Sequence, residues 1–142
     1  MEDSEFDTLF KLVSLEETAR AWCSYEMREH PDDEGNDPDW WAVHLMIVMT
    51  DDGGPEEPPR TILTLIAEFA ENDDVLGVMG AGPLEAFISD DEGRIRWIEA
   101  QAAASENFRK ALAAVWVRFD VTPETFARLE GAAGVKLGGP GT

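Results

Sequence analysis

Apolar residues recur three and four positions apart along most of this chain, the spacing that places side chains on one face of an α-helix. The clearest stripes are Phe6, Leu9, Phe10 and Val13; Leu15, Ala19, Trp22, Cys23 and Met27; Ile62, Leu65, Ile66 and Phe69; and Phe108, Leu112, Val115 and Trp116. We find no segment with the period of two that a half-buried strand requires. The pattern predicts an all-α protein, a single domain of about seven short helices in an antiparallel bundle or a short solenoid-like stack.

Helix start signals support this interpretation. Ser14-Leu15-Glu16-Glu17 has the form of a capping box, in which the Ser hydroxyl accepts a free backbone N–H at the start of a helix. Ser105 and Thr122-Pro123 are further N-cap signals, and the first of them opens the helix that we expect to carry Trp116 in the core. Asp73 is expected to cap a short helix that ends at the turn Gly80-Ala81-Gly82, after which Pro83 opens the next helix.

Two polar loops enclose the most apolar part of the chain. Residues 31–39 (PDDEGNDPD) and 51–59 (DDGGPEEPP) are too rich in Asp, Gly and Pro to be regular, and Arg60 should begin the following helix. Between them, residues 40–49 are apolar on nearly every side and fit a buried helix or a buried strand. The Asp37-Pro38 start signal favours a buried central helix.

A resemblance becomes visible in the middle of the sequence. Asp73-Asp74-Val75-Leu76 followed by Gly80-Ala81-Gly82-Pro83-Leu84-Glu85 resembles a bacterial all-helical domain family of unknown function. Ala21-Trp22 with Tyr25 upstream, and Phe108-Arg109-x-Ala111-Leu112 downstream, fit the same pattern. The resemblance extends from about residue 15 to residue 129 and implies a helical fold without implying an activity. We place the domain at residues 1–131, and we expect residues 132–142 to be a flexible Gly-rich tail.

Composition adds one unusual feature, which is charge. The 142 residues include 30 acidic and 11 basic side chains, for a net charge of −19 at pH 7. The first 74 residues hold 21 of the acidic and four of the basic side chains. Such a field repels nucleic acid and anionic membranes and attracts basic partners, although solubility alone is an alternative explanation. One cysteine, no basic and apolar leader, and no long apolar run predict a cytoplasmic protein without membrane spans.

The sequence offers little for catalysis or for cofactors. His30, His44 and Cys23 are too few and too scattered for a typical zinc site, and we expect Cys23 and His44 to belong to the core. Gly77, Gly80 and Gly82 do not have the spacing of a dinucleotide fingerprint, and their structural interpretation is favoured over anion binding. We therefore predict no metal, no cofactor and no enzymatic activity.

These observations favour a binding module for a basic protein, for example an inhibitor or immunity-type protein that acts by charge complementarity. Trp40 and Trp41 lie about 100° apart on a helix, so one of them could serve as an exposed anchor next to the acidic loops, the alternative being that both are buried. The predicted partner-binding residues are Asp32, Asp33, Glu34, Asp37, Asp39, Trp40, Asp51, Asp52, Glu56 and Glu57. A nucleic-acid mimic, a structural subunit of a complex and an enzyme of unrecognised class stay open as alternatives, as does the oligomeric state.

Overall fold

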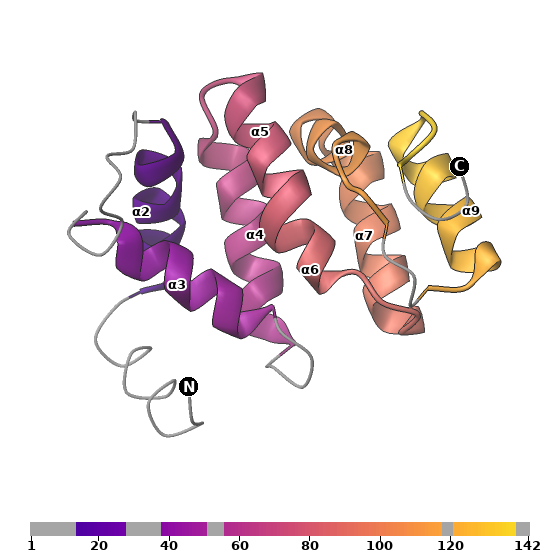
Figure 1. Cartoon of the computed structure of the whole chain (residues 1–142), viewed down its shortest axis with the longest axis horizontal. Coiled ribbons are helices and arrows are strands. Elements are labelled where there is room, and N and C mark those ends of the chain that lie inside the picture. Colours follow the sequence, from indigo (N-terminus) through magenta and orange to yellow (C-terminus); the bar gives the residue numbers. More distant parts are fainter. Residues whose placement is uncertain (1–13, 28–37, 51–55, 118–120, 139–142) are drawn as a thin grey trace. The chain divides into compact units, whose positions relative to one another are not determined.

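Three helices make up the described part of the N-terminal unit, which covers residues 1–69 (Figure 1). The computed structural model describes residues 14–27, 38–50, 56–117 and 121–138. The three helices are α2 (Leu15–Met27), α3 (Trp40–Met49) and α4 (Glu57–Phe69). The stripe predicted from Phe6 to Val13 lies outside the described residues.

Helix α2 begins as predicted and packs on both α3 and α4. The Ser14 hydroxyl accepts the backbone N–H of Glu17 at 3.0 Å, which satisfies one of the free donors at the helix start. Trp22 and Cys23 face inward and are 2 % exposed, and the Cys23 thiol lies 3.9 Å from the carbonyl oxygen of Ile66 on α4. The predicted inward stripe of α2 is therefore confirmed for Ala19, Trp22 and Cys23, whereas it was wrong for Met27, which is 39 % exposed at the end of the helix.

The apolar run at residues 40–49 is helical, as its start signal indicated, but the helix begins later than predicted. Asp39 occupies the N-cap position and makes no side-chain capping bond, so the start predicted at Asp37-Pro38, with Asp37 as the cap, was wrong. The buried residues of α3 are Ala42, Leu45, Met46 and Met49. They lie on one side of the helix, so α3 has an inner and an outer face although both are apolar.

Helix α4 also departs from the predicted boundary. It begins at Glu57 and includes Pro58 and Pro59, which were assigned to the preceding loop. Proline is tolerated in the first turn of a helix because the N–H groups there have no intrahelical partner. Ile62 and Ile66 then face the core and are fully buried, as the periodicity predicted.

The C-terminal unit, residues 70–142, is also helical where the structure describes it. Its elements are α5 (Asp73–Met79), η2 (Gly80–Leu84), α6 (Glu85–Phe87), α7 (Glu92–Ala104), α8 (Glu106–Ala113) and α9 (Pro123–Ala133). Helix α8 packs against α5, α7 and α9, and α7 also packs against α9. Phe108 on α8 is fully buried and meets Trp97 on α7 edge to face, with ring centroids 5.5 Å apart. The all-α prediction is confirmed for the described residues of both units.

The predicted turn at Gly80-Ala81-Gly82 does not exist. The chain stays helical from Asp73 to Phe87, and residues 80–84 form a π-type segment. Pro83 has no N–H to donate, and the wider segment accommodates it because the N–H of Glu85 reaches the carbonyl of Gly80, five residues back.

Gly80 is needed for close packing and not for a turn. Its φ of −65° is ordinary for a helix. A Cβ added there would overlap the carbonyl oxygen of Ala111 on α8 and come within 3.0 Å of the Ala114 Cβ. The absence of a side chain at residue 80 therefore lets the two backbones approach each other closely.

The N-caps of the later helices follow their local sequence closely. Ser105 accepts from the N–H of Phe108 at 3.1 Å, as predicted. Helix α5 is capped by Asn72, one residue before the predicted Asp73, through a 2.9 Å bond from the N–H of Val75. Asp91 caps α7 by accepting from the N–H of Arg94 at 2.9 Å.

Asp90 fixes the start of α9. Its Oδ1 accepts the backbone N–H of Thr122 at 2.9 Å and the hydroxyl of Thr125 at 2.7 Å. These bonds, the one from the Thr122 N–H above all, lower the pKa of Asp90 below its ordinary value. Thr122 is itself the N-cap of α9, as predicted. The Asp90 carboxylate therefore links the connection between α6 and α7 to the start of α9.

Trp116 does not belong to the core, contrary to the prediction. Helix α8 ends at Ala113, and Trp116 lies in an extended segment with 62 % of its surface exposed. It forms an isolated parallel bridge with Gly138. The chain between α9 and this bridge includes Leu137, which is 1 % exposed, so the buried structure continues past the domain boundary predicted at residue 131.

Candidate binding surfaces

The outer face of α3 is apolar and partly accessible. Trp40, Val43 and Ile47 follow one another at helical spacing on the side opposite Leu45 and Met49. Ile47 is 58 % exposed, and Trp40 and Val43 are half-buried. A helix that is apolar on all sides is normally enclosed, so an accessible outer face on α3 is unusual.

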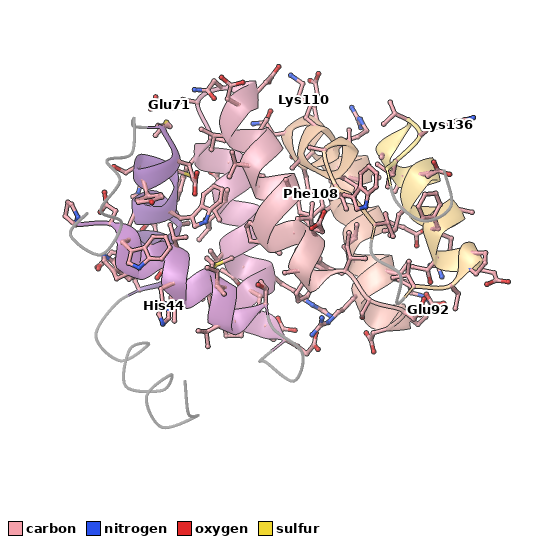
Figure 2. All side chains as sticks on the ribbon, viewed as in Figure 1. His44, Glu71, Glu92, Phe108, Lys110 and Lys136 are labelled. Atoms are coloured by element: carbon pink, nitrogen blue, oxygen red, sulfur yellow. The ribbon has the colours of Figure 1, made fainter. Side chains whose placement is uncertain are left out.

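His44 lies on this same outer face. It is exposed and projects from α3, so its assignment to the core was wrong (Figure 2). The prediction failed because a uniformly apolar helix gives no periodic signal that distinguishes its inner side from its outer side.

The two neighbouring tryptophans are both half-buried, a result between the two alternatives that the sequence allowed. The ring of Trp40 packs against Tyr25 of α2 with centroids 5.6 Å apart. This contact fixes the orientation of Trp40 while leaving part of its surface on the outer face of α3.

The structure describes four of the ten predicted partner-binding residues. Asp39 and Trp40 lie at the start of α3, and Glu56 and Glu57 lie at the start of α4. Both glutamates pair with Arg60, at 3.5 and 3.9 Å, yet their side chains stay 49 % and 83 % exposed. The other six lie outside the described residues: Asp32, Asp33, Glu34, Asp37, Asp51 and Asp52.

The exposed tryptophan of the C-terminal unit was missed by the sequence analysis. The backbone N–H of Trp116 donates to Glu85 at 2.8 Å, and its ring lies against Gly138, where a Cβ would come within 2.6 Å of Cζ3. The periodicity of the preceding helix continues through residue 116, so the sequence contains no sign that the helix has already ended.

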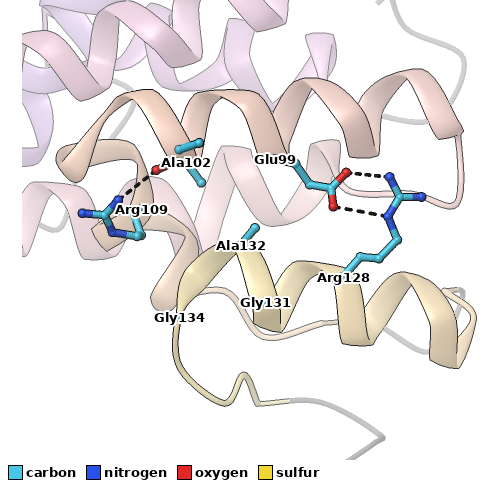
Figure 3. Close-up of a pocket in the computed structure, with 8 residues that line it drawn as sticks. Glu99, Ala102, Arg109, Arg128, Gly131, Ala132 and Gly134 are labelled. Atoms are coloured by element: carbon cyan, nitrogen blue, oxygen red, sulfur yellow. Dashed lines mark hydrogen bonds and ion pairs between the residues drawn. The ribbon is translucent and has the colours of Figure 1, made fainter.

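The C-terminal unit also contains an open hollow of about 570 Å³ between α7, α8 and α9 (Figure 3). Its polar lining consists of Arg109, Arg128 and Glu99. The other lining residues are small: Ala102, Ala103, Gly131, Ala132 and Gly134. Figure 3 shows Arg109 at one end, the pair Glu99–Arg128 at the other, and Gly131 and Ala132 between them. The hollow therefore has charged side chains at its two ends and a lining of small Ala and Gly residues between them.

The two arginines of the hollow differ in their partners. Arg128 forms a two-bond contact with Glu99 and donates to both oxygens of Glu92 at 2.9 and 2.8 Å. These bonds raise the pKa of Arg128 above its ordinary value, and those with Glu99 have the largest effect. Arg109 instead donates to the carbonyl oxygen of Ala102 at 3.1 Å. Within the described part of the chain, no carboxylate pairs with Arg109.

The described residues offer neither a metal site nor a membrane-spanning helix. No three His, Cys, Asp or Glu side chains among them gather closely enough to hold a metal ion. None of their helices has both the length and the apolar composition to cross a bilayer.

These features define a helical protein whose N-terminal unit has an accessible apolar helix face and whose C-terminal unit has a small charged hollow. The chain belongs to a family of unknown function, DUF6869, which matches residues 29–136. The predicted membership of an uncharacterised domain family is thereby confirmed. The resemblance was placed at residues 15–129, whereas the family match begins later, at residue 29, and ends later, at residue 136. No curated protein and no solved structure matches the chain.

Proposed function

We propose that this protein is a binding module that captures a basic partner protein by means of the outer face of α3. The observation that carries the proposal is the accessible apolar stripe of Trp40, Val43 and Ile47 in a chain of net charge −19. Apolar surface that stays accessible, with Ile47 58 % exposed and the other two residues half-buried, is a candidate site of interaction.

The charge around the stripe indicates the chemistry of the partner. Helix α3 directly follows one acidic run of the sequence and directly precedes the other, so carboxylates adjoin both of its ends. Among the described carboxylates, Asp39 stands at its N-terminus, and Glu56 and Glu57 follow it in the chain. Their field favours a partner with basic groups on either side of an apolar contact and increases the rate of encounter.

An amphipathic basic helix best satisfies both requirements. Its apolar residues, repeating every three or four positions, would pack along Trp40, Val43 and Ile47, and its lysines and arginines would meet the carboxylates. Neutralising a basic partner in the reducing cytoplasm, in the manner of an inhibitor or immunity-type protein, is the role that this chemistry supports.

A defined peptide tests the proposal. The probe is an 18-residue Leu/Lys peptide with amphipathic helical spacing, and its control is a scrambled peptide of the same composition. Binding is measured by fluorescence anisotropy at about 0.05 M and 0.5 M salt. We expect the patterned peptide to bind more tightly than the scrambled one and to weaken at high salt. Equal affinity for the two peptides would contradict the proposal, since charge alone would then explain the binding.

A pair of variants locates the surface. Ile47→Ser removes the most exposed apolar group of α3 and should weaken binding about tenfold, because burying such a side chain contributes at least 1.4 kcal/mol, or about a factor of ten. Val78→Ser makes the same kind of change on α5, where the side chain is 40 % exposed, and should leave binding unchanged. If both variants bind like the parent protein, α3 is not the docking face.

The first acidic run, residues 31–39, is tested separately by the association rate. Changing Asp32, Asp33 and Glu34 to their amides should slow association and leave stability unchanged or higher, because like charges repel one another. A stopped-flow measurement that finds the same on-rate would remove this run from the binding surface.

A further inference from the structure

We propose that the hollow lined by Arg109, Gly131 and Ala132 is a binding site for a small carboxylate with an apolar body. The site lies entirely within the C-terminal unit, and the inference does not depend on the role proposed for α3. It rests on the pairing of the basic side chains, on the shape of the hollow and on the charge of its lining.

Arg109 differs from most basic residues of the described chain. Five others form ion pairs with carboxylates: Arg20, Arg60, Arg96, Lys110 and Arg128. Arg109 lines a hollow, and its guanidinium has no carboxylate partner among the described residues. This is unexpected in so acidic a protein. The Ala102 carbonyl occupies one of its nitrogens, and the remaining N–H groups are suited to a two-bond contact with a planar carboxylate.

The wall of the hollow is built to leave space. Gly131 lies in the last turn of α9 and is exposed at the edge of the hollow. A Cβ added at this position would meet nothing within 4 Å. Packing therefore does not require the glycine, and a larger side chain at this position would have room to extend over the space next to Ala132. A volume of about 570 Å³ lies within the range of small-molecule sites.

The charges of the lining limit the ligand to a single negative charge. The pairing of Arg128 with Glu99 and Glu92 leaves one guanidinium, that of Arg109, for a ligand. A doubly charged phosphate would meet the same single guanidinium, the nearby Glu99 and the field of a protein of net charge −19. A monocarboxylate matches the one available cation, and a short alkyl body fits the alanine and glycine wall.

The inference is tested with 4-methylpentanoate as the probe and 4-methylpentanamide as its neutral analogue. Binding to the ¹⁵N-labelled full chain is followed by amide chemical shifts, with inorganic phosphate as a second anion. We expect the carboxylate to bind with a Kd on the order of 1 mM and to shift the amides of residues 131–134. The amide analogue should bind at least tenfold more weakly, because it lacks the charge that Arg109 recognises.

Two variants act on the site in independent ways. Arg109→Gln removes the charge and should weaken carboxylate binding at least tenfold. Gly131→Leu leaves Arg109 in place and fills the hollow, so it should abolish the shifts, whereas Gly77→Leu on α5 is the matched control that should bind normally. Equal binding of the two analogues, tighter binding of phosphate, or normal binding by Gly131→Leu would each overturn the proposal.

Discussion

Gly80→Ala provides the sharpest test of the packing in the C-terminal unit. The added methyl would overlap the carbonyl oxygen of Ala111, lie 2.9 Å from its carbonyl carbon and lie 3.0 Å from the Ala114 Cβ. Two of these three atoms belong to the backbone of α8, so the clash cannot be relieved by a change of side-chain rotamer. Relief requires the two helices to move apart, which opens gaps between the residues packed around them.

The size of the effect follows from two opposing contributions. Overpacking typically costs about 1–3 kcal/mol, and backbone obstacles place Gly80 at the upper end of that range. Alanine recovers about 1 kcal/mol of helix propensity. We therefore expect a net loss of about 2 kcal/mol in the free energy of unfolding of this unit.

The matched control is Gly77→Ala, three residues earlier in the same helical stretch. A Cβ there would meet nothing within 4 Å, so the propensity gain of about 1 kcal/mol should appear without a clash. Urea unfolding followed by circular dichroism measures both changes. The reasoning is refuted if the two variants shift the midpoint in the same direction, because the close approach to Ala111 would then have no energetic effect.

Two other predictions concern the connections of the C-terminal unit. Asp90→Ala should cost about 1–2 kcal/mol, because the N–H of Thr122 and the hydroxyl of Thr125 lose their acceptor, whereas Asp90→Asn, which keeps an acceptor oxygen, should cost less. Because the pKa of Asp90 is lower in the folded protein than the value near 3.8 in the unfolded chain, its carboxylate stabilises the fold above that pH. This contribution should disappear as the pH falls through the lower pKa of the folded state. Acid unfolding curves that coincide for the parent protein and Asp90→Ala would contradict the prediction. Gly138→Ala should displace the ring of Trp116, so it should change the tryptophan emission, and an unchanged spectrum would argue against their contact.

The features that sequence analysis predicted correctly are those that depend on a few neighbouring residues. The caps at Ser14, Ser105 and Thr122 require only a hydroxyl at the first position and backbone N–H groups two or three residues later. The buried stripe of α4 follows in the same way from a period of 3.6. Local chemistry was thus sufficient for the fold class and for the three helix starts that these hydroxyl residues cap.

The features that it missed depend on contacts between distant residues. Gly80 and Pro83 are a strong local signal for a turn, but Ala111 lies against Gly80, and close packing of η2 on α8 explains the glycine without a turn. The end of α8 before Trp116 is marked by neither Gly nor Pro, so the periodic pattern extended the helix too far.

The candidate sites show the same division. The acidic residues next to α3 are evident from the sequence, whereas the outer face of α3 is not, because nearly every side of this helix is apolar. The hollow brings Arg109 of α8 to Gly131 of α9, and this depends on how α7, α8 and α9 pack. Arg109 was part of a motif visible in the sequence, but nothing local indicated that no described carboxylate would pair with it.

The burial of Cys23 makes the chain its own reporter of local opening. Cys23 is the one thiol in the sequence, and it is enclosed between α2 and α4. A thiol reagent can react with it only when these helices separate, so the labelling rate at low reagent concentration measures the population of that open form. The opening free energy of the N-terminal unit can thus be measured in the unmodified protein, independently of the unfolding of α5 to α9.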